Sequence, residues 1–246
     1  MSNEHLKEDL VLSIRERYQH IQARIAEAAA GSRFAAKSIR LVVVSKSQPM
    51  DVIRAAIAAN VTVLGENYVE EAVEKIATLK ETGVEWHMIG HVQSRKAELV
   101  AKNFSMLHSL DNLKLAVRLD RFCSESKRIL PVLLEFNVSG EESKFGFPAW
   151  DEQYWPELLA EIERILTLSH LHICGLMTMP PFFTDPEQTR PYFRRLRGLR
   201  EYLEKNIPQA DWSDLSMGTS VDFVAAVQEG ATFVRIGQAI LGSRPK

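Results

Sequence analysis

A lysine at the end of an apolar run is the first candidate for chemistry in this chain. Lys46 follows residues 41–45 (LVVVS), and such a β-branched run is typical of a strand that is buried on both faces. Pro49 then ends the strand and favours the start of a helix. Partial desolvation at the rim of a strand lowers the pKa of an amine and makes it a nucleophile that can form a Schiff base. The alternative is a lysine that reaches solvent, which this run alone favours.

A second candidate is a pair of glycine-containing loops near the C-terminus. Residues 216–220 (SMGTS) run into a predicted helix, and Gly237 follows the last predicted strand. Small residues let backbone N–H groups approach a ligand, hydroxyls can donate, and a helix N-terminus favours an anion. The two loops therefore predict a cup for a phosphate monoester, and the alternative is a plain N-cap by Thr219 or Ser220. The predicted phosphate-binding residues are Ser216, Gly218, Thr219, Ser220 and Gly237.

Arg235 is predicted to point into the same region. It alternates with apolar residues in the last predicted strand and shares its face with Gly237. An inward arginine near the rim of a sheet needs a partner, and a pyridine nitrogen or a carboxylate would serve. The alternative is an ordinary ion pair with Asp222 or Glu66.

A reactive lysine, a phosphate cup and an inward arginine together fit pyridoxal 5′-phosphate (PLP). Its aldehyde would bond Lys46, its phosphate would sit on the cup, and Arg235 would face the ring nitrogen. A cation there opposes protonation of the ring nitrogen, so the ring would be a weak electron sink. This arrangement argues against transamination.

Three other residues follow predicted strands at the same edge. Asn67 is a small polar residue at a strand end, and we expect it to contact the cofactor. His91 could contact the cofactor or cap the helix near Ser94. Met177 is most simply a packing residue, although it could line the ring.

Eight strand-like runs alternate with helical patterns and must position these residues. The strands are predicted at 39–45, 61–65, 85–89, 106–109, 129–138, 172–177, 212–216 and 232–236. The helices are predicted at 50–59, 68–80, 94–102, 113–126, 155–166, 187–205 and 221–229, with a short last segment at 238–241. This order predicts one α/β domain over residues 1–246, a TIM-type (β/α)8 barrel with its site at the carboxyl ends of the strands. An open doubly wound sheet is the alternative, but residues 45–48 (SKSQ) are not its glycine fingerprint.

An amphipathic helix precedes the first strand and is expected to pack on the barrel as an extension over residues 1–35. Apolar residues recur there at three- and four-residue spacing: Leu6, Leu10, Ile14, Tyr18, Ile21 and Ile25.

Composition excludes several classes of protein. The formal net charge of −2 gives no basic field for nucleic acid, and no apolar run approaches the ~20 residues of a membrane span. Cys123 and Cys174 read as buried thiols in a reducing compartment, and the N-terminus shows no signal peptide, so we expect a cytoplasmic protein. No histidine shows metal spacing with cysteine or carboxylates, so no metal is expected. The arginines of residues 190–200 are interpreted as a solvated helix face.

The chain resembles the pyridoxal phosphate homeostasis proteins, single-domain relatives of the alanine racemase N-terminal barrel among the fold-type III pyridoxal enzymes. The matching segments follow the family order at residues 44–46, 65–68, 86–93, 137–139, 143–146, 175–177, 215–218 and 234–237. The resemblance implies that Lys46 carries PLP as a Schiff base and that residues 216–220 with Gly237 hold its phosphate. Thr219 departs from the family, which more often has methionine there.

The resemblance also implies a role in vitamin B6 homeostasis: a protein that buffers PLP and delivers it, with PLP-dependent apoenzymes as possible acceptors. We expect no catalytic residues, and a monomer or weak dimer. Few loops are long enough to form a lid, and an exposed cofactor suits hand-over better than catalysis.

The main alternative is a PLP-dependent amino-acid racemase, which needs an acid or base on each face of the substrate. Alanine racemases take the second base from a tyrosine of an additional C-terminal domain, which we do not expect in a chain ending at Lys246. Tyr68 is the only tyrosine near a predicted carboxyl-end loop. A Schiff-base aldolase that acts on a phosphorylated sugar would use the same lysine and cup. A regulatory module that binds a partner protein, through the N-terminal helix, is the third hypothesis that competes with the carrier.

Overall fold

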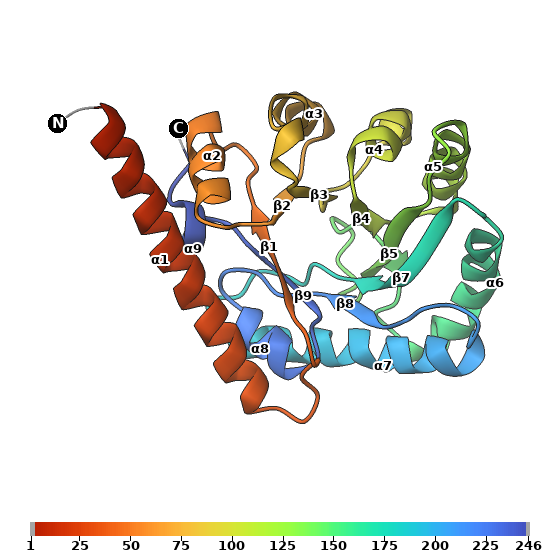
Figure 1. Ribbon diagram of the computed structural model, residues 1–246. Helices are drawn as coiled ribbons and strands as arrows, with labels where there is room; N and C mark the ends of the chain where they lie inside the picture. Colours follow the sequence, from red (N-terminus) through yellow and green to blue (C-terminus); the bar gives the residue numbers. More distant parts are fainter. Residues whose placement is uncertain (1–2, 245–246) are drawn as a thin grey trace.

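Parallel strands and helices alternate around a closed barrel in the computed structural model, which describes residues 3–244 (Figure 1). The eight barrel strands are β1 (Arg40–Val44), β2 (Val63–Glu66), β3 (Glu85–Met88), β4 (Met106–Leu110), β5 (Leu130–Asn137), β7 (Leu171–Met177), β8 (Asp214–Ser216) and β9 (Phe233–Ile236). Each strand pairs in parallel with its neighbours, β1 pairs with β9, and the β4–β5 pairing closes the circle. The predicted TIM-type (β/α)8 barrel is confirmed.

Helices follow the strands and cover the outside of the barrel (Figure 1). They are α2 (Met50–Ala58), α3 (Val69–Thr78), α4 (Ala97–Asn103), α5 (Leu113–Glu125), α6 (Trp155–Leu166), α7 (Arg190–Asn206), α8 (Phe223–Gln228) and α9 (Gln238–Leu241). Short 3₁₀ turns are formed by Lys80–Thr82, Ser94–Lys96, Glu152–Tyr154 and Pro186–Thr189. Element ends differ from the predicted ones by a few residues, and 3₁₀ turns take the place of two predicted helix starts, at Ser94–Lys96 and Pro186–Thr189.

A two-residue strand, β6 (Phe147–Pro148), pairs with the end of β5 outside the circle. It was not predicted, because two residues carry no periodic pattern. Gly175 lies where β7 and β8 approach each other closely. At its φ of 148° an added Cβ would lie 1.9 Å from the carbonyl oxygen of Asp214, so only glycine lets β7 lie against β8 here.

The N-terminal helix α1 (Asn3–Ala30) packs on α2, α8 and α9, as Figure 1 shows. Ile14, Tyr18, Ile21 and Ile25 are buried, which confirms the predicted amphipathic face. The side chain of Leu6 and residues 1–2 and 245–246, which the predicted boundaries include, lie outside the described part of the chain. No helix in residues 3–244 combines the length and apolar character needed to cross a membrane.

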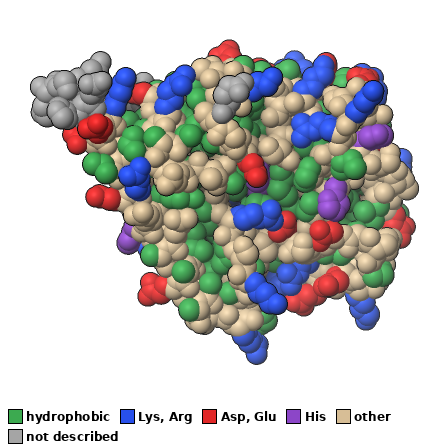
Figure 2. All heavy atoms as spheres, viewed as in Figure 1, with side chains coloured by type: hydrophobic (Ala, Val, Ile, Leu, Met, Phe, Trp, Pro, Cys, Tyr) green, Lys and Arg blue, Asp and Glu red, His purple; other side chains and the backbone are tan. Residues whose placement is uncertain are grey.

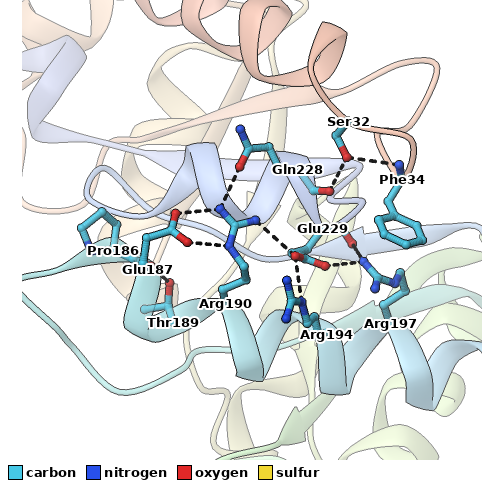
Figure 3. Close-up of polar contacts among 10 residues, drawn as sticks. All are labelled: Ser32, Phe34, Pro186, Glu187, Thr189, Arg190, Arg194, Arg197, Gln228 and Glu229. Atoms are coloured by element: carbon cyan, nitrogen blue, oxygen red, sulfur yellow. Dashed lines mark hydrogen bonds and ion pairs between the residues drawn. The ribbon is translucent and has the colours of Figure 1, made fainter.

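The arginine-rich face of α7 is mostly not solvated. Arg190, Arg194 and Arg197 converge on Glu229, which follows α8, as Figure 3 shows. Arg190 Nη1 and Arg194 Nε lie 3.1 and 3.0 Å from Glu229 Oε1, and Arg197 Nη1 binds Oε2. Burial acts to raise the pKa of Glu229, but these hydrogen bonds outweigh it and hold that pKa below its usual range. The interpretation as a solvated face is wrong, because the side chains of Arg190 and Arg197 are only 18% and 13% exposed.

Replacing Glu229 with glutamine is expected to lower the free energy of unfolding by about 2 kcal/mol. The amide keeps the shape of the side chain but leaves the guanidinium groups of Arg190 and Arg197 without their shared carboxylate. Urea denaturation measures the effect, and Glu187→Gln is the matched control. Glu187 also pairs with Arg190 but is 62% exposed, so its loss should cost below about 1 kcal/mol. Equal losses in the two variants would contradict a buried role for Glu229.

Candidate functional site

The carboxyl ends of the strands surround a cavity of about 410 Å³. Polar and charged side chains from six strands or the loops after them line it. Of the predicted site residues, the cavity wall includes Lys46, Asn67, His91, Thr219, Ser220, Arg235 and Gly237. Other hollows of similar or larger volume lie beside α1, but enzymes and binding proteins built on this barrel use its carboxyl end.

Lys46 lies in the loop that follows β1 and is half-buried at the cavity wall. Burial lowers the pKa of its amine, and the charge of Arg244 lowers it further, while Glu66 acts in the opposite sense. Lowering the pKa increases the neutral, nucleophilic fraction of the amine at neutral pH. Lys46 is thus more nucleophilic than a fully solvated lysine.

A buried ion cluster fixes the backbone on both sides of Lys46. Lys75 Nζ lies 2.7 Å from Glu66 Oε1 and 2.5 Å from Glu71 Oε1, and it donates to the carbonyl oxygen of Ser45 at 2.8 Å. The Ser45 hydroxyl donates to Glu66 Oε1, and the Ser47 N–H donates to Glu71 Oε1, each at 2.7 Å. Ser47 has a φ of 56°, so this loop adopts a backbone conformation that needs such support. Glu66, one predicted alternative partner of Arg235, is bonded to Lys75 instead.

The predicted phosphate segment forms a tight loop between β8 and α8. Gly218 has a φ of 92°, and an added Cβ would lie 2.5 Å from Ala226 Cβ, so the loop requires glycine. The N–H and hydroxyl of Thr219 donate to Asp222 Oδ1 at 2.7 and 2.9 Å. Thr219 and Ser220 do not cap α8, whose N-cap position is Asp222, so the alternative interpretation as a plain N-cap is wrong. Gly218 itself is buried behind the cavity wall.

Arg235 enters the cavity from β9 and is only 4% exposed. Its Nη1 donates to Ser216 Oγ at 2.5 Å, and its Nη2 donates to the Thr178 carbonyl at 2.9 Å and to Met179 Sδ at 2.8 Å. Burial lowers its pKa to about 10, against the attraction of Asp222 and Glu135. Within residues 3–244, no carboxylate accepts a hydrogen bond from this guanidinium. The predicted ion pairs do not form, and the charge remains available to a ligand.

Ser216 and Met177 are not in the cavity wall. Ser216 is fully buried and holds Arg235 from behind. Met177 is 1% exposed and packs inside the barrel, among Val42, Ile89, Met106, Leu133, Cys174 and Phe233. Met179, two residues further along, is 39% exposed and lines the cavity. An extended chain advances by about 3.3 Å per residue, so two residues carry it from the interior to the mouth.

Asn67 and His91 lie at the mouth. Asn67 is half-buried in the loop after β2. His91 follows β3, its Nδ1 lies 2.8 Å from Asp111 Oδ2, and its ring stacks on Phe145 at 3.7 Å between centroids. Gln93, not His91, occupies the N-cap position of the turn at Ser94–Lys96, so the helix-capping alternative is wrong.

The sequence analysis did not include Glu135, Lys144 or Arg244 among the predicted site residues, and all three line the cavity. Glu135 lies on β5, is 7% exposed, and has one carboxyl oxygen with no hydrogen-bond partner among the described residues. Burial and the nearby Asp111 raise its pKa to about 7, against Arg235 and Lys144. An acidic residue inside an otherwise apolar run was the available signal.

The carboxyl-end cavity is thus strongly cationic. Four basic side chains reach it, from Lys46, Lys144, Arg235 and Arg244, against the single carboxyl group of Glu135. Opposite charge at close range stabilises a bound anion, and more so in a partly desolvated site. By contrast, basic and acidic side chains are interspersed over the face of the molecule in Figure 2.

One group with metal-ligand chemistry lies elsewhere. His172, Cys174 and Asp211 place their ligand atoms within 4.8 Å of one another near the start of β7, although their sequence positions show no metal spacing. Burial, aided by two aspartates, raises the pKa of Cys174 to about 11, and its thiol donates to the His172 carbonyl at 3.4 Å. The thiol would have to lose this proton to bind a metal, because the thiolate is the binding form.

Comparisons with known proteins agree with this geometry. A family model described as "Alanine racemase, N-terminal domain" matches residues 16–245. The pyridoxal phosphate homeostasis protein of Aquifex aeolicus is 38% identical over 230 residues, which are 93% of this chain and 97% of that protein. The protein of the same name from Pseudomonas aeruginosa is 39% identical over 232 residues, 94% of this chain and 96% of that protein.

Two solved structures extend the comparison. PipY of Synechococcus elongatus with PLP bound has a TM-score of 0.80 and 32% identity, and the match covers 93% of this chain and all of that one (100%). An alanine racemase from Streptomyces coelicolor has a TM-score of 0.70 and covers 94% of this chain and 58% of that one. Its 16% identity supports the common fold alone. The near full-length matches above 30% identity establish that this chain belongs to the pyridoxal phosphate homeostasis protein family, within the group that shares the alanine racemase N-terminal domain.

Proposed function

We propose that this protein binds PLP in its carboxyl-end cavity, holds it as a Schiff base on Lys46, and buffers and delivers it in vitamin B6 homeostasis without catalytic turnover. The observation that carries the proposal is one cavity that joins a lysine of lowered pKa to a buried arginine that binds no carboxylate. The relatives named for PLP homeostasis, and PipY with PLP bound, support the same assignment.

The residues of the cavity fit the parts of PLP. Thr219, Ser220 and Gly237 would hold the phosphate, and Arg235 would face the ring nitrogen. Lys46 would bond the aldehyde carbon, the electrophile that PLP supplies when bound. Asn67 and His91 would contact the cofactor at the mouth. Met177, Ser216 and Gly218 would support these contacts from behind the wall.

Delivery of the cofactor requires a site from which PLP can leave. The cavity mouth is bordered by exposed side chains, including Phe145 at 54% and Met179 at 39%. Access of this kind suits transfer of PLP to apoenzymes. We propose that the protein acts in the cytoplasm as a monomer or weak dimer, without a nucleic-acid or membrane partner.

A second candidate function is PLP-dependent racemisation, and one observation favours it. Glu135 lines the cavity with a pKa raised to about 7, a value suited to a general acid or base at neutral pH. Tyr68, the tyrosine weighed for this role, is 55% exposed and is not part of the cavity wall. Loss of the α-hydrogen of amino acids to D₂O solvent, at an enzyme's rate, would favour racemisation over the carrier function.

The proposed function is tested by adding PLP to the purified protein and recording its visible absorption. A yellow band should appear, and borohydride reduction followed by peptide mapping should place the label on Lys46. Lys144 is the internal comparison, because its amine lines the same cavity. A protein that stays colourless with excess PLP would contradict the proposal and favour the Schiff-base aldolase. A label confined to Lys144 would contradict the proposal as well.

A further inference from the structure

A chain of hydrogen bonds runs through the barrel interior from the cavity toward the opposite end. Arg235 Nη1 lies 2.5 Å from Ser216 Oγ, and Ser216 Oγ lies 2.8 Å from His108 Nδ1. His108 Nε2 lies 3.0 Å from His87 Nδ1, and His87 Nε2 lies 3.5 Å from a carboxylate oxygen of Glu85. Four strands, β9, β8, β4 and β3, contribute to this chain, which joins the proposed cofactor site to the amino-terminal mouth.

Arg235 and Glu85, at the two ends of this chain of hydrogen bonds, fix the direction of every hydrogen bond in it. Arginine can only donate, so the Ser216 oxygen accepts from Arg235. Among the described residues His108 Nδ1 is the one other hydrogen-bond partner of Ser216 Oγ, so the hydroxyl proton finds an acceptor only if it points to His108. His108 Nδ1 must therefore accept, which places the ring proton on Nε2, where it is donated to His87 Nδ1. His87 then carries its proton on Nε2, facing Glu85, and an ionised carboxylate can only accept. The contact with Glu85, at 3.5 Å, thus favours the same direction as the Arg235 end.

Both histidines are therefore neutral and share one tautomer. An added proton on His87 Nδ1 would face the His108 Nε2–H, and an added proton on His108 Nδ1 would face the Ser216 hydroxyl proton. Burial holds the pKa of His108 well below its usual range, and the charges of Arg235 and Arg40 lower it further. The Phe233 ring contacts both imidazoles edge-on, at 5.8 Å from His87 and 4.8 Å from His108 between centroids.

We propose that His108 and His87 are positioning residues for Arg235, which they hold toward the cavity through the Ser216 hydroxyl. A hydroxyl free to rotate could turn its proton toward the guanidinium and lose that hydrogen bond. Because His108 Nδ1 accepts the hydrogen bond from the Ser216 hydroxyl, Ser216 Oγ presents a lone pair to Arg235. The effect on the cofactor rests on the proposed function, whereas the tautomers can be measured without PLP.

The first test is nitrogen NMR of the histidine rings in the cofactor-free protein. His87 and His108 should both carry a proton on Nε2 and none on Nδ1, and should stay so from about pH 8 to about pH 6, on either side of an unperturbed histidine pKa. The exposed His20 is the internal reference. A proton on Nδ1 of His108, or a doubly protonated ring near pH 7, would overturn the inference whatever the protein binds.

The second test separates positioning from mere packing. His108→Leu removes the acceptor, and PLP binding should weaken about tenfold, the usual loss of one hydrogen bond to a charged group. The pH midpoint of the visible band should shift as well. His108→Gln keeps one acceptor and one donor, so it should restore most of the PLP affinity and most of the pH midpoint. Wild-type affinity and midpoint in His108→Leu would overturn the positioning role.

Ser216→Ala provides a test that does not depend on a change of the imidazole. It should weaken PLP binding by a similar factor and release His108 into a mixture of tautomers, seen in the same NMR spectrum. An unchanged His108 tautomer together with wild-type affinity would overturn the proposal. His172→Gln is the matched control, because His172 is exposed and is not part of this chain of hydrogen bonds. It should change neither the PLP affinity nor the tautomer of His108.

Discussion

A Lys46→Ala variant is expected to form no visible band with PLP and to bind it on the order of 100-fold more weakly than the wild type, a loss of roughly 3 kcal/mol. The Schiff base is the one covalent link in the proposed complex, and Lys46 is the cavity amine whose pKa burial lowers. Phosphate and ring contacts would remain and give weak binding. Absorption spectroscopy and equilibrium dialysis measure the two effects.

The matched control is Lys144→Ala, which removes a second amine from the same cavity. Lys144 Nζ lies 3.4 Å from the Pro180 carbonyl and 4.0 Å from Glu141, and it is expected to contribute only charge to the site. That variant should keep its visible band with a modest loss of affinity. A band that persists in Lys46→Ala and disappears in Lys144→Ala would reverse the assignment.

A Lys75→Met variant is expected to lose about 3–5 kcal/mol of unfolding free energy at neutral pH. Lys75 is the cation that faces Glu66, and the two side chains are 7% and 0% exposed. Without it, a fully buried carboxylate would keep only the Ser45 hydroxyl as a donor. The loop that carries Lys46 should also loosen, so slower reaction with PLP is expected alongside lower stability.

The loss in Lys75→Met should shrink as the pH falls. Burial raises the pKa of Glu66 even when Lys75 opposes this, and removing Lys75 raises it further. Below that raised pKa the folded carboxyl binds a proton more readily than the unfolded one, so lowering the pH toward about 4.5 recovers stability. Urea denaturation across this pH range tests the trend. A deficit that grows on acidification would contradict the role given to Glu66.

Two further variants isolate burial as the cause. The double variant Lys75→Met with Glu66→Leu should recover much of the lost stability, because no uncompensated charge is left. Lys96→Met breaks an ion pair with the largely exposed Glu70, and it should cost less than about 1 kcal/mol. A cost for Lys96→Met equal to that of Lys75→Met would show that burial is not the deciding factor.

The fold could be predicted from the sequence because each strand and helix carries its own period. The run before Lys46 and the stripe on α1 are local patterns, and both were confirmed. Element ends were less accurate, because 3₁₀ turns such as Pro186–Thr189 share the composition of helix ends. β6 was too short to leave a pattern.

The site could be predicted only where a residue stands at a strand's carboxyl end. Lys46 and Gly237 have that signal, and both line the cavity. Met177 also ends a strand, yet it packs inside the barrel, and the chain reaches the cavity only two residues later, at Met179. Hydrogen bonds and ion pairs between residues that are distant in the sequence leave no local sequence pattern. The bonds of Glu66 to Lys75 and of Ser216 to Arg235 and His108 depend on which strands become neighbours.

The packing of α1 on α8 and α9 sets an order of events during folding. The first helix also packs on α2, but its packing is complete only after the last two helices exist, and β1 acquires its second neighbour only when β9 has formed. Contacts between distant parts of a chain form slowly, because the loop entropy is lost before they form. During synthesis Lys46 would therefore be present long before Arg235, and the cofactor would bind only when the last strand, β9, has joined the barrel.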